Sequence, residues 1–287
     1  MGSVTWFRGT TKPVLVLVCL ANVACSVLID KERVQCTTDT DCHTRGADFA
    51  GSVCVESICQ PDPIWGCVGS VSFPKPSPGT YTVTIHVRDL VTGGLIPGAS
   101  GRLCERPDPT CKMPISGDVP TNEAGDLVLP VRSGFDGYVE LQAPGRMNGL
   151  YFIYPPVDAD REIPLVPLLE TPLVEQLAQL NGKHLVPERG HVLLGVYDCG
   201  RKPAQGATLS VTDADDQTAG FYVLNNLPKI GAPFTDASGR GGFINVKAGI
   251  VAITANVAAD NRKIATVSLF VRPGEMTFTS IVPSPTK

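Results

Sequence analysis

The strongest constraint on the fold is an arrangement of strands and turns that occurs twice along the chain. The first copy begins with YTVTIHVRD, residues 81–89, in which apolar and polar side chains alternate. This period of two is typical of a strand with one buried face. The second copy begins with HVLLGVYDCG, residues 191–200, and the two strands end at Asp89 and Asp198. The repeat predicts two structurally similar domains.

Matching turns follow both strands. A short connection leads to Pro97-Gly98-Ala99 in the first copy and to the segment 203–207, PAQGA, in the second. The motif T-[ND]-x-x-G comes later, at residues 121–125 and 235–239. Glycine permits a tight turn at these positions, and the Asn or Asp of the motif can accept bonds from nearby backbone amides. Short strands separated by such turns predict an all-β fold of two tandem β-sandwiches.

The combined pattern resembles a known family. D-x-x-T-G-x-x-[IL]-P-G-A followed by T-[ND]-x-x-G is similar to the carboxypeptidase regulatory-like domain, a transthyretin-like sandwich related to Cna protein B-type modules. The residues that carry the resemblance are Asp89, Thr92, Gly93, Ile96, Pro97, Gly98 and Ala99 in the first copy and Asp198, Pro203, Gly206, Ala207, Thr235, Asp236 and Gly239 in the second.

The resemblance covers residues 80–169 and 188–283. It implies two Ig-like or transthyretin-like sandwiches of the kind that serve as stalks, accessory domains or adhesion modules, and such a fold does not name an activity. Some Cna B-type modules form a Lys–Asn isopeptide bond with the lysine on the first strand. Neither first strand contains a lysine here, so we expect no such bond.

The ten cysteines indicate disulfides in an oxidising compartment, because five of them lie between Cys36 and Cys67. Structural zinc sites place cysteines in closer pairs than these, and His43 is a single histidine in a polar loop. We therefore favour disulfides over a metal site. Cys104 and Cys111 form a local bridge if the chain turns back between them. The disulfide candidates are Cys36, Cys42, Cys54, Cys59, Cys67, Cys104, Cys111 and Cys199. Cys199 either pairs with Cys67 or remains a free thiol.

Residues 1–24 have the pattern of a secretory signal peptide. A polar segment with Arg8 and Lys12 precedes the apolar run PVLVLVCLANVA, which ends in the small residue Ala24 before Cys25. Such a signal directs a chain out of the cytosol, which agrees with the oxidising compartment that the disulfides indicate.

The residues around Cys25 resemble the lipobox of bacterial lipoproteins, in which a small residue precedes a cysteine that is acylated and becomes the new N-terminus. Val23 and Ala24 match, whereas Asn22 stands where that family usually has leucine. Cys19 is a second candidate, but it follows a larger residue. The resemblance implies lipidation of Cys25 and a membrane anchor through the N-terminal lipid. The alternatives are cleavage without lipidation and an uncleaved N-terminal anchor.

These features divide the chain into six segments. They are a signal peptide (1–24), a Cys-rich stem (25–70), a linker (71–80), a first sandwich (81–169), a short helix with a linker (170–187) and a second sandwich (188–287). In the helical segment Thr171 is suited to capping, Pro172 to the first turn and Asn181-Gly182 to the end. The shared face of Leu173, Leu177 and Leu180 predicts a helix that packs on a sandwich or, alternatively, binds a partner.

No arrangement of residues predicts catalysis. There is no HExxH, G-x-S-x-G or P-loop motif. The four histidines are His43, His86, His184 and His191, and the nearest serine candidates, Ser210 and Ser238, lie in strand or turn context. We expect no cofactor and no enzymatic activity.

Two further groups of residues have a functional and a structural interpretation. Acidic segments at Thr38–Asp41 and at Asp213, Asp215 and Asp216 are calcium candidates, but the first lacks the Gly and Glu of an EF-hand loop. We interpret both as polar turns and expect no metal. A glycan-binding platform or, as we favour, core packing accounts for the aromatic residues Tyr151, Phe152, Tyr154, Phe221 and Tyr222.

The charge excludes one class of partner. The formal net charge is −4, and removal of residues 1–24 with their two cations leaves −6. Nucleic-acid binding needs clustered Lys and Arg, so nucleic acid is not an expected partner. We expect a non-catalytic protein of the bacterial cell envelope, anchored at the outer membrane or else secreted, that presents two sandwiches to a protein or a glycan. The alternative is an accessory or inhibitor-like subunit of a secreted enzyme.

Overall fold

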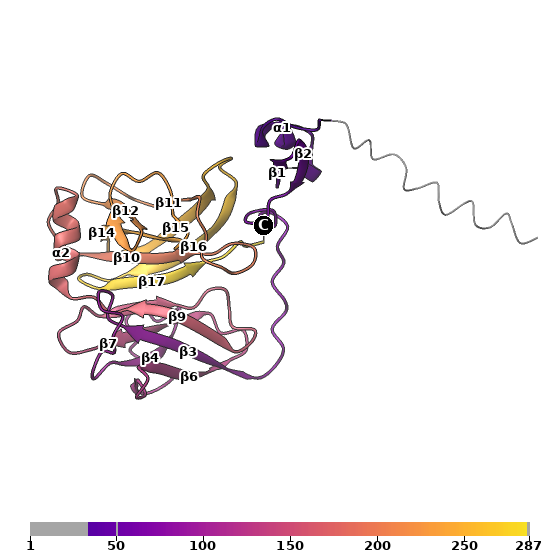
Figure 1. The fold of residues 1–287 in the computed structure, drawn as a ribbon. Helices are drawn as coiled ribbons and strands as arrows, with labels where there is room; N and C mark the ends of the chain where they lie inside the picture. The colour runs from indigo at the N-terminus through magenta and orange to yellow at the C-terminus, as the bar shows by residue number, and fades with distance from the viewer. Residues whose placement is uncertain (1–33, 50, 286–287) are drawn as a thin grey trace, which may run out of the picture. The chain divides into compact units, whose positions relative to one another are not determined.

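The computed structural model describes residues 34–49 and 51–285. The chain divides into two compact units, Met1–Pro61 and Asp62–Lys287 (Figure 1). Residues 62–70, which the sequence analysis assigned to the Cys-rich stem, belong to the larger unit. The reason is that they pack on the sandwiches: Trp65 is buried in one of their cores.

The predicted signal peptide and the cysteines Cys19 and Cys25 lie outside the described residues. In the part of the chain that the structure describes, no helix has the length and apolar character needed to cross a bilayer.

Two disulfides hold the smaller unit together. Its elements are α1 (Asp39–His43), the 3-10 helix η1 (Ala47–Phe49), β1 (Ser52–Val55) and β2 (Ile58–Pro61). The bridges Cys36–Cys54 and Cys42–Cys59 tie α1 and the segment before it to the β1–β2 hairpin. A segment of this size buries too little apolar surface to fold without such links.

The segment Thr38–Asp41 forms the start of α1. Asp41 Oδ2 accepts hydrogen bonds from the backbone N–H groups of Thr37 at 2.7 Å and Thr38 at 2.8 Å, and from the Thr37 hydroxyl at 2.8 Å. These bonds stabilise the charged carboxylate and lower the pKa of Asp41 to about 2. The carboxylate therefore caps a helix, as acidic residues in a first turn commonly do.

In the larger unit, the sequence repeat is also a repeat of strand pairing. The equivalent central strands and their neighbours are β3 (Thr80–Arg88) and β10 (Arg189–Val196), β6 (Asp126–Arg132) and β14 (Arg240–Lys247), and β9 (Arg161–Pro167) and β17 (Met276–Ile281). β3 pairs antiparallel with β6 and parallel with β9. β10 likewise pairs antiparallel with β14 and parallel with β17.

A second set of strands repeats in the same way. The equivalent strands are β4 (Ser100–Glu105) and β11 (Ala207–Val211), β7 (Gly137–Gln142) and β15 (Gly249–Val257), and β8 (Gly149–Phe152) and β16 (Lys263–Val271). β7 pairs antiparallel with β4 and β8, and β15 with β11 and β16. Three further strands extend one sheet at its two ends: β5 (Val119–Pro120) at one end, and β12 (Ala219–Leu224) and β13 (Leu227–Lys229) at the other.

The two repeats share one sheet. β8 of the first repeat pairs in parallel with β17 of the second, with Gly149 opposite Met276. This pairing creates a nine-stranded sheet in the order β13-β12-β14-β10-β17-β8-β7-β4-β5, accompanied by the three-stranded sheets β6-β3-β9 and β11-β15-β16. The all-β prediction is confirmed, but the repeats are fused rather than merely placed in tandem. Each of the two edge strands satisfies the free backbone groups of the other.

Alternate residues of the shared sheet enter two different cores. In β8, Leu150 and Phe152 belong to the core under β11-β15-β16, whereas Tyr151 belongs to the core under β6-β3-β9. In β10, Val192 and Leu193 are divided in the same way. Side chains of successive strand residues point to opposite faces, so these strands are buried on both sides.

The helix α2 (Thr171–Leu180) joins the core under β6-β3-β9 and covers residues of the second repeat there (Figure 1). Its N-cap is Glu170, so Thr171 is the first helical residue and not the cap that the sequence suggested. Gly182, with φ 65°, follows the C-cap Asn181, as a helix end requires. Val174 and Ala178 are its buried residues, whereas Leu180 is exposed.

The repeated turn motifs end at a glycine with positive φ in both copies. Gly125 and Gly239 have φ values of 75° and 65°, a region that favours glycine. A Cβ on Gly239 would lie 2.3 Å from the carbonyl oxygen of Val196, so the turn has no room for a side chain at this position. Asn122 Oδ1 accepts from the Asp126 N–H at 2.9 Å, and Asp236 Oδ1 from the Ser238 N–H at 2.8 Å.

A candidate ligand-binding pocket between the two repeats

A pocket of about 350 Å³ lies where the two repeats meet, within the larger unit. We call it the junction pocket. Its polar and aromatic lining comes from Tyr151, Tyr154, Arg161 and Glu162 of the first repeat and from Tyr197, Arg201 and Ser280 of the second. Small-molecule sites are commonly concavities of this size with a few polar groups set among apolar surface. The fused sheet therefore creates a site that neither repeat forms alone.

Tyr151, on β8, lines the junction pocket. Its ring is buried, and its hydroxyl lies 3.1 Å from Ser280 Oγ on β17. Burial raises the pKa of Tyr151 to about 12, so the phenol stays protonated and can donate a hydrogen bond.

Arg161 supports one wall of the pocket. Its guanidinium donates to the carbonyl oxygens of Pro155 at 2.7 Å and Pro156 at 3.2 Å, and lies 3.5 Å from Asp158 Oδ1. Burial lowers the pKa of Arg161, and the positive charge of Arg201 lowers it further. Two cations thus influence one partly apolar concavity, which makes it suited to an anion.

Arg201 lies in a tight turn of the second repeat. Asp198 Oδ1 accepts from the Lys202 N–H at 2.8 Å, and the Arg201 N–H donates to the Asp198 carbonyl at 3.0 Å. Arg201 has a φ of 60°, a left-handed conformation that is unfavourable for a residue other than Gly, Asn or Asp. Among the described residues, its guanidinium has no hydrogen-bond or ion-pair partner.

The disulfide Cys67–Cys199 fixes this turn to the segment that precedes the first repeat. The backbone N–H of Cys199 also donates to the Ile64 carbonyl at 3.1 Å. The turn that carries Arg201 is therefore anchored covalently two residues away, which preorganises its position at the pocket.

The five aromatic residues for which we favoured core packing over a glycan platform have different surroundings. Tyr151 and Tyr154 line the junction pocket, whereas Phe152 and Phe221 are buried in the two cores. Tyr222 is partly buried, and its hydroxyl accepts from the Leu209 N–H at 2.9 Å. Sequence reasoning missed Tyr197, Arg161 and Arg201. No local pattern shows that two strands more than 120 residues apart in the sequence, such as β8 and β17, will pair.

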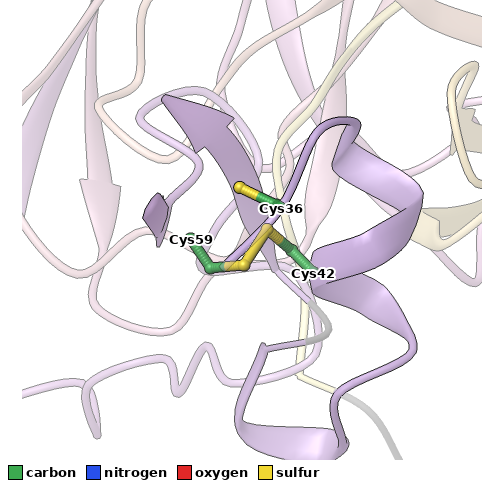
Figure 2. A group of neighbouring side chains, drawn as sticks. All are labelled: Cys36, Cys42 and Cys59. Atoms are coloured by element: carbon green, nitrogen blue, oxygen red, sulfur yellow. A yellow bond between two sulfur atoms is a disulfide. The ribbon is translucent and has the colours of Figure 1, made fainter. Parts of the chain in front are cut away.

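All eight described cysteines are paired. The bridges are Cys36–Cys54, Cys42–Cys59, Cys67–Cys199 and Cys104–Cys111. Figure 2 shows that Cys36 lies beside the Cys42–Cys59 bridge, which brings three sulfur atoms close enough together to contact one metal ion. A metal needs thiolates, and in these bridges each sulfur is bonded to another sulfur.

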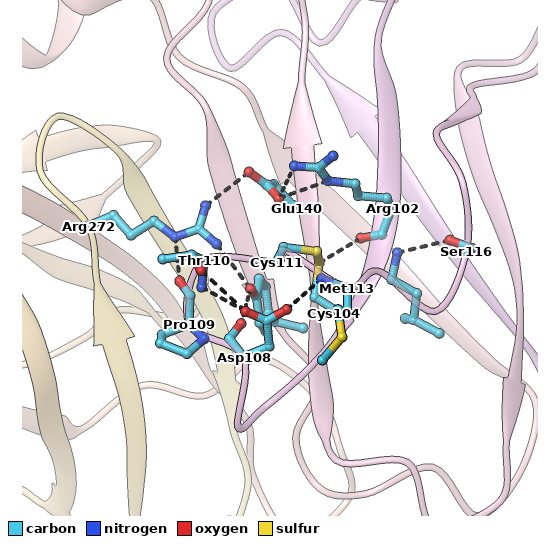
Figure 3. Close-up of a disulfide and its surroundings, with 12 residues drawn as sticks. Arg102, Cys104, Asp108, Pro109, Thr110, Cys111, Met113, Ser116, Glu140 and Arg272 are labelled. Carbon is cyan, nitrogen blue, oxygen red and sulfur yellow. Dashed lines mark hydrogen bonds and ion pairs between the residues drawn. A yellow bond between two sulfur atoms is a disulfide. The ribbon is translucent and has the colours of Figure 1, made fainter.

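The Cys104–Cys111 bridge closes a loop that clamps the two repeats together (Figure 3). Arg272, after β16, donates to the Pro109 carbonyl at 2.8 Å, to Glu140 Oε1 at 2.9 Å and to the Tyr138 hydroxyl at 3.0 Å. Glu140 lies near the two sulfurs, but its carboxylate is already occupied by Arg272 and by Arg102 at 3.0 Å. This cluster therefore has a structural role at the junction.

Each of the four histidines has different hydrogen-bond partners. His86 lies between Asp126 at 2.6 Å and Glu162 at 2.7 Å, and hydrogen bonds to these carboxylates raise its pKa. His191 is buried, which lowers its pKa to about 4, and its Nδ1 accepts from the Asn245 N–H at 3.2 Å. The other two histidine contacts are those of His43 with the Ser52 carbonyl and His184 with Glu175.

The remaining sequence candidates have ordinary structural partners. Asp215 is paired with Arg189 at 2.7 Å and with Lys247 at 3.2 Å, and the Arg189 hydrogen bonds lower its pKa strongly. Ser238 donates to the Val223 carbonyl at 3.2 Å, and Ser210 is exposed on β11. Two cations at Asp215 leave little reason for a calcium ion to bind there.

Comparison with known proteins leaves the family open. No model of a known protein family matches the chain, and no curated protein matches its sequence. Among solved structures, the chain is similar to the Bacillus anthracis TIE protein (13% identity, TM-score 0.23, 71% of this chain and 34% of that one).

It is also similar to the shaft pilin SpaA of Lactobacillus rhamnosus GG (10% identity, TM-score 0.22, 74% of this chain and 100% of that one). A third similar structure is BcpA, the major pilin subunit of Bacillus cereus (10% identity, TM-score 0.24, 72% and 100%). The chain spans about a third of the TIE protein. All three TM-scores are too low to define a family or a function.

Proposed function

We propose that this chain is a non-catalytic protein of the bacterial cell envelope that is anchored by lipid on Cys25 and binds a glycan or a protein through its fused sandwiches. The observation that carries the proposal is the junction pocket. It combines aromatic surface with the guanidinium of Arg201, which has no hydrogen-bond or ion-pair partner among the described residues. Sites of this composition bind ligands without needing a catalytic group.

The disulfides support the location. Eight cysteines form four bridges in the described residues, and bridges of this kind persist in oxidising compartments and are rare in the bacterial cytosol. The bridges Cys36–Cys54 and Cys42–Cys59 follow Cys25 closely in the sequence, so export of the segment next to Cys25 fits their formation. A diacylated N-terminus would hold such a protein stably on a membrane.

The test is the intact mass of the mature protein from its native host, measured with and without reductant. We expect an N-terminus at Cys25 with acyl mass, and a gain of eight hydrogen atoms on reduction from the four bridges. Cys25→Ser should abolish the acyl mass, whereas the matched variant Cys19→Ser should retain it. A mature protein without acyl mass would refute the anchor, and a retained Met1 with free thiols would refute export.

A pull-down from native envelope separates the binding function from the alternative. A stoichiometric enzyme that copurifies with the chain would show an accessory subunit. Recovery of the chain on envelope glycans without an enzyme would support the proposal.

A further inference from the structure

We propose that the junction pocket binds an acidic sugar residue, with its carboxylate at Arg201 and its ring among the tyrosines. This assigns a ligand class to the glycan-binding function proposed above and rests on it. The proposal combines three features of the pocket: its charge, its hydroxyl groups and the conformation of Arg201.

The charge of the pocket calls for an anion. Arg161 is partly satisfied by two backbone carbonyls and Asp158, whereas the guanidinium of Arg201 has no hydrogen-bond or ion-pair partner among the described residues. The carboxylate that lines the pocket, Glu162, lies 2.7 Å from Nε2 of His86. A guanidinium recognises a carboxylate through paired, charge-assisted hydrogen bonds.

The hydroxyl groups fit a sugar better than a peptide. Tyr151, Tyr154, Tyr197 and Ser280 line the pocket, and each has a hydroxyl, a group that can donate as well as accept. Sugar hydroxyls have the same dual character, and the apolar face of a sugar ring packs on aromatic surface. An extended peptide would instead pair with a free strand edge. The β9 edge at the pocket carries Pro164, which has no N–H to donate.

The third feature is the backbone conformation of Arg201. A φ of 60° is unfavourable for arginine, and Gly or Asn would occupy this turn position with less strain. Residues in such conformations are concentrated at ligand sites. The adjacent Cys67–Cys199 bridge holds the turn in place, so the backbone that carries Arg201 is positioned before any ligand arrives.

The test uses the full chain, with disulfides intact, titrated with glucuronic acid, N-acetylmuramic acid and N-acetylneuraminic acid, and with glucose and N-acetyltyrosine for comparison. Binding is measured by saturation-transfer NMR and calorimetry. Arg201→Asn removes the guanidinium and leaves a residue that tolerates positive φ. Lys202→Asn is the matched control, because it removes one charge from the same turn outside the pocket lining.

We expect at least one acidic sugar to bind more tightly than glucose. Arg201→Asn should weaken that binding about tenfold or more, as expected for loss of a charge-assisted pair, while Lys202→Asn should leave it unchanged. The proposal is overturned if no acidic sugar binds, if glucose binds equally well, if both variants weaken binding alike, or if only N-acetyltyrosine binds. The mass measurement is independent, so a chain without an anchor that binds acidic sugar would refute only the location.

Discussion

The Cys67–Cys199 bridge should contribute more to stability than the Cys104–Cys111 bridge, although both lie in the larger unit. The two bridges close loops of very different length, with sequence separations of 132 and 7 residues. In the chain-entropy model, the loss of unfolded-state entropy grows with the logarithm of loop length. It corresponds to about 5 kcal/mol for the long loop and about 2 kcal/mol for the short one.

Packing reduces this difference. Cys104 and Cys111 are buried in a core, so replacing both with alanine also removes buried sulfur atoms, at a further cost of about 1 kcal/mol. The double variant Cys67→Ala/Cys199→Ala should therefore lose about 2 kcal/mol more free energy of unfolding than Cys104→Ala/Cys111→Ala.

The assay is equilibrium unfolding in urea, followed by circular dichroism for the sheets and by the fluorescence of Trp65, which is buried beside Cys67. Coincident transitions from the two signals would show that the loss is global and not confined to the segment around Trp65. Equal losses for the two double variants, or a larger loss for the short loop, would show that loop closure does not dominate and would refute the reasoning.

Two further predictions concern the strands. Gly149→Ala should destabilise the fused sheet by about 1–3 kcal/mol, because the added Cβ would lie 2.9 Å from Phe278 Cε2 and 3.0 Å from Leu168 Cδ2. Thermal unfolding measures this, and Gly117→Ala, which meets no atom within 4 Å, should be neutral; equal effects would contradict the close approach. The raised pKa of His86 means that its bridge to Asp126 and Glu162 stabilises the fold below the unfolded pKa near 6.5 and loses this contribution as the pH rises through the folded pKa. His86→Gln should therefore lower the free energy of unfolding more at about pH 5.5 than at about pH 9, measured by unfolding in urea. The control is His184→Gln, because the side chain of His184 is 85% exposed. A loss of stability that does not depend on pH would exclude the charged bridge.

Local sequence was sufficient for the turns and for one class of strand. Gly125 and Gly239 have positive φ as the T-[ND]-x-x-G motif required, because a turn of this kind depends on a few neighbouring residues. The alternation in residues 81–88 matched a strand with one buried face, and β3 has that burial pattern. The end of α2 at Asn181-Gly182 was predicted for the same local reason.

The fused sheet had a signal in the sequence that the repeat alone did not explain. HVLLGV in β10 and GLYF in β8 are apolar without alternation, which is typical of strands buried on both faces. That pattern indicates a covered strand but does not say what covers it. The pairing of β8 with β17 depends on residues more than 120 positions apart.

The sequence by itself determined the β class, the repeat with its turns, and the abundance of cysteines, because each follows from short-range sterics or from composition. Only the tertiary structure decided that the two repeats share a sheet, which cysteines are bonded, and that Tyr151, Arg161, Tyr197 and Arg201 surround one pocket. These features arise from contacts between distant segments. Such contacts are selected by how all the apolar surfaces and free strand edges of the chain are satisfied together.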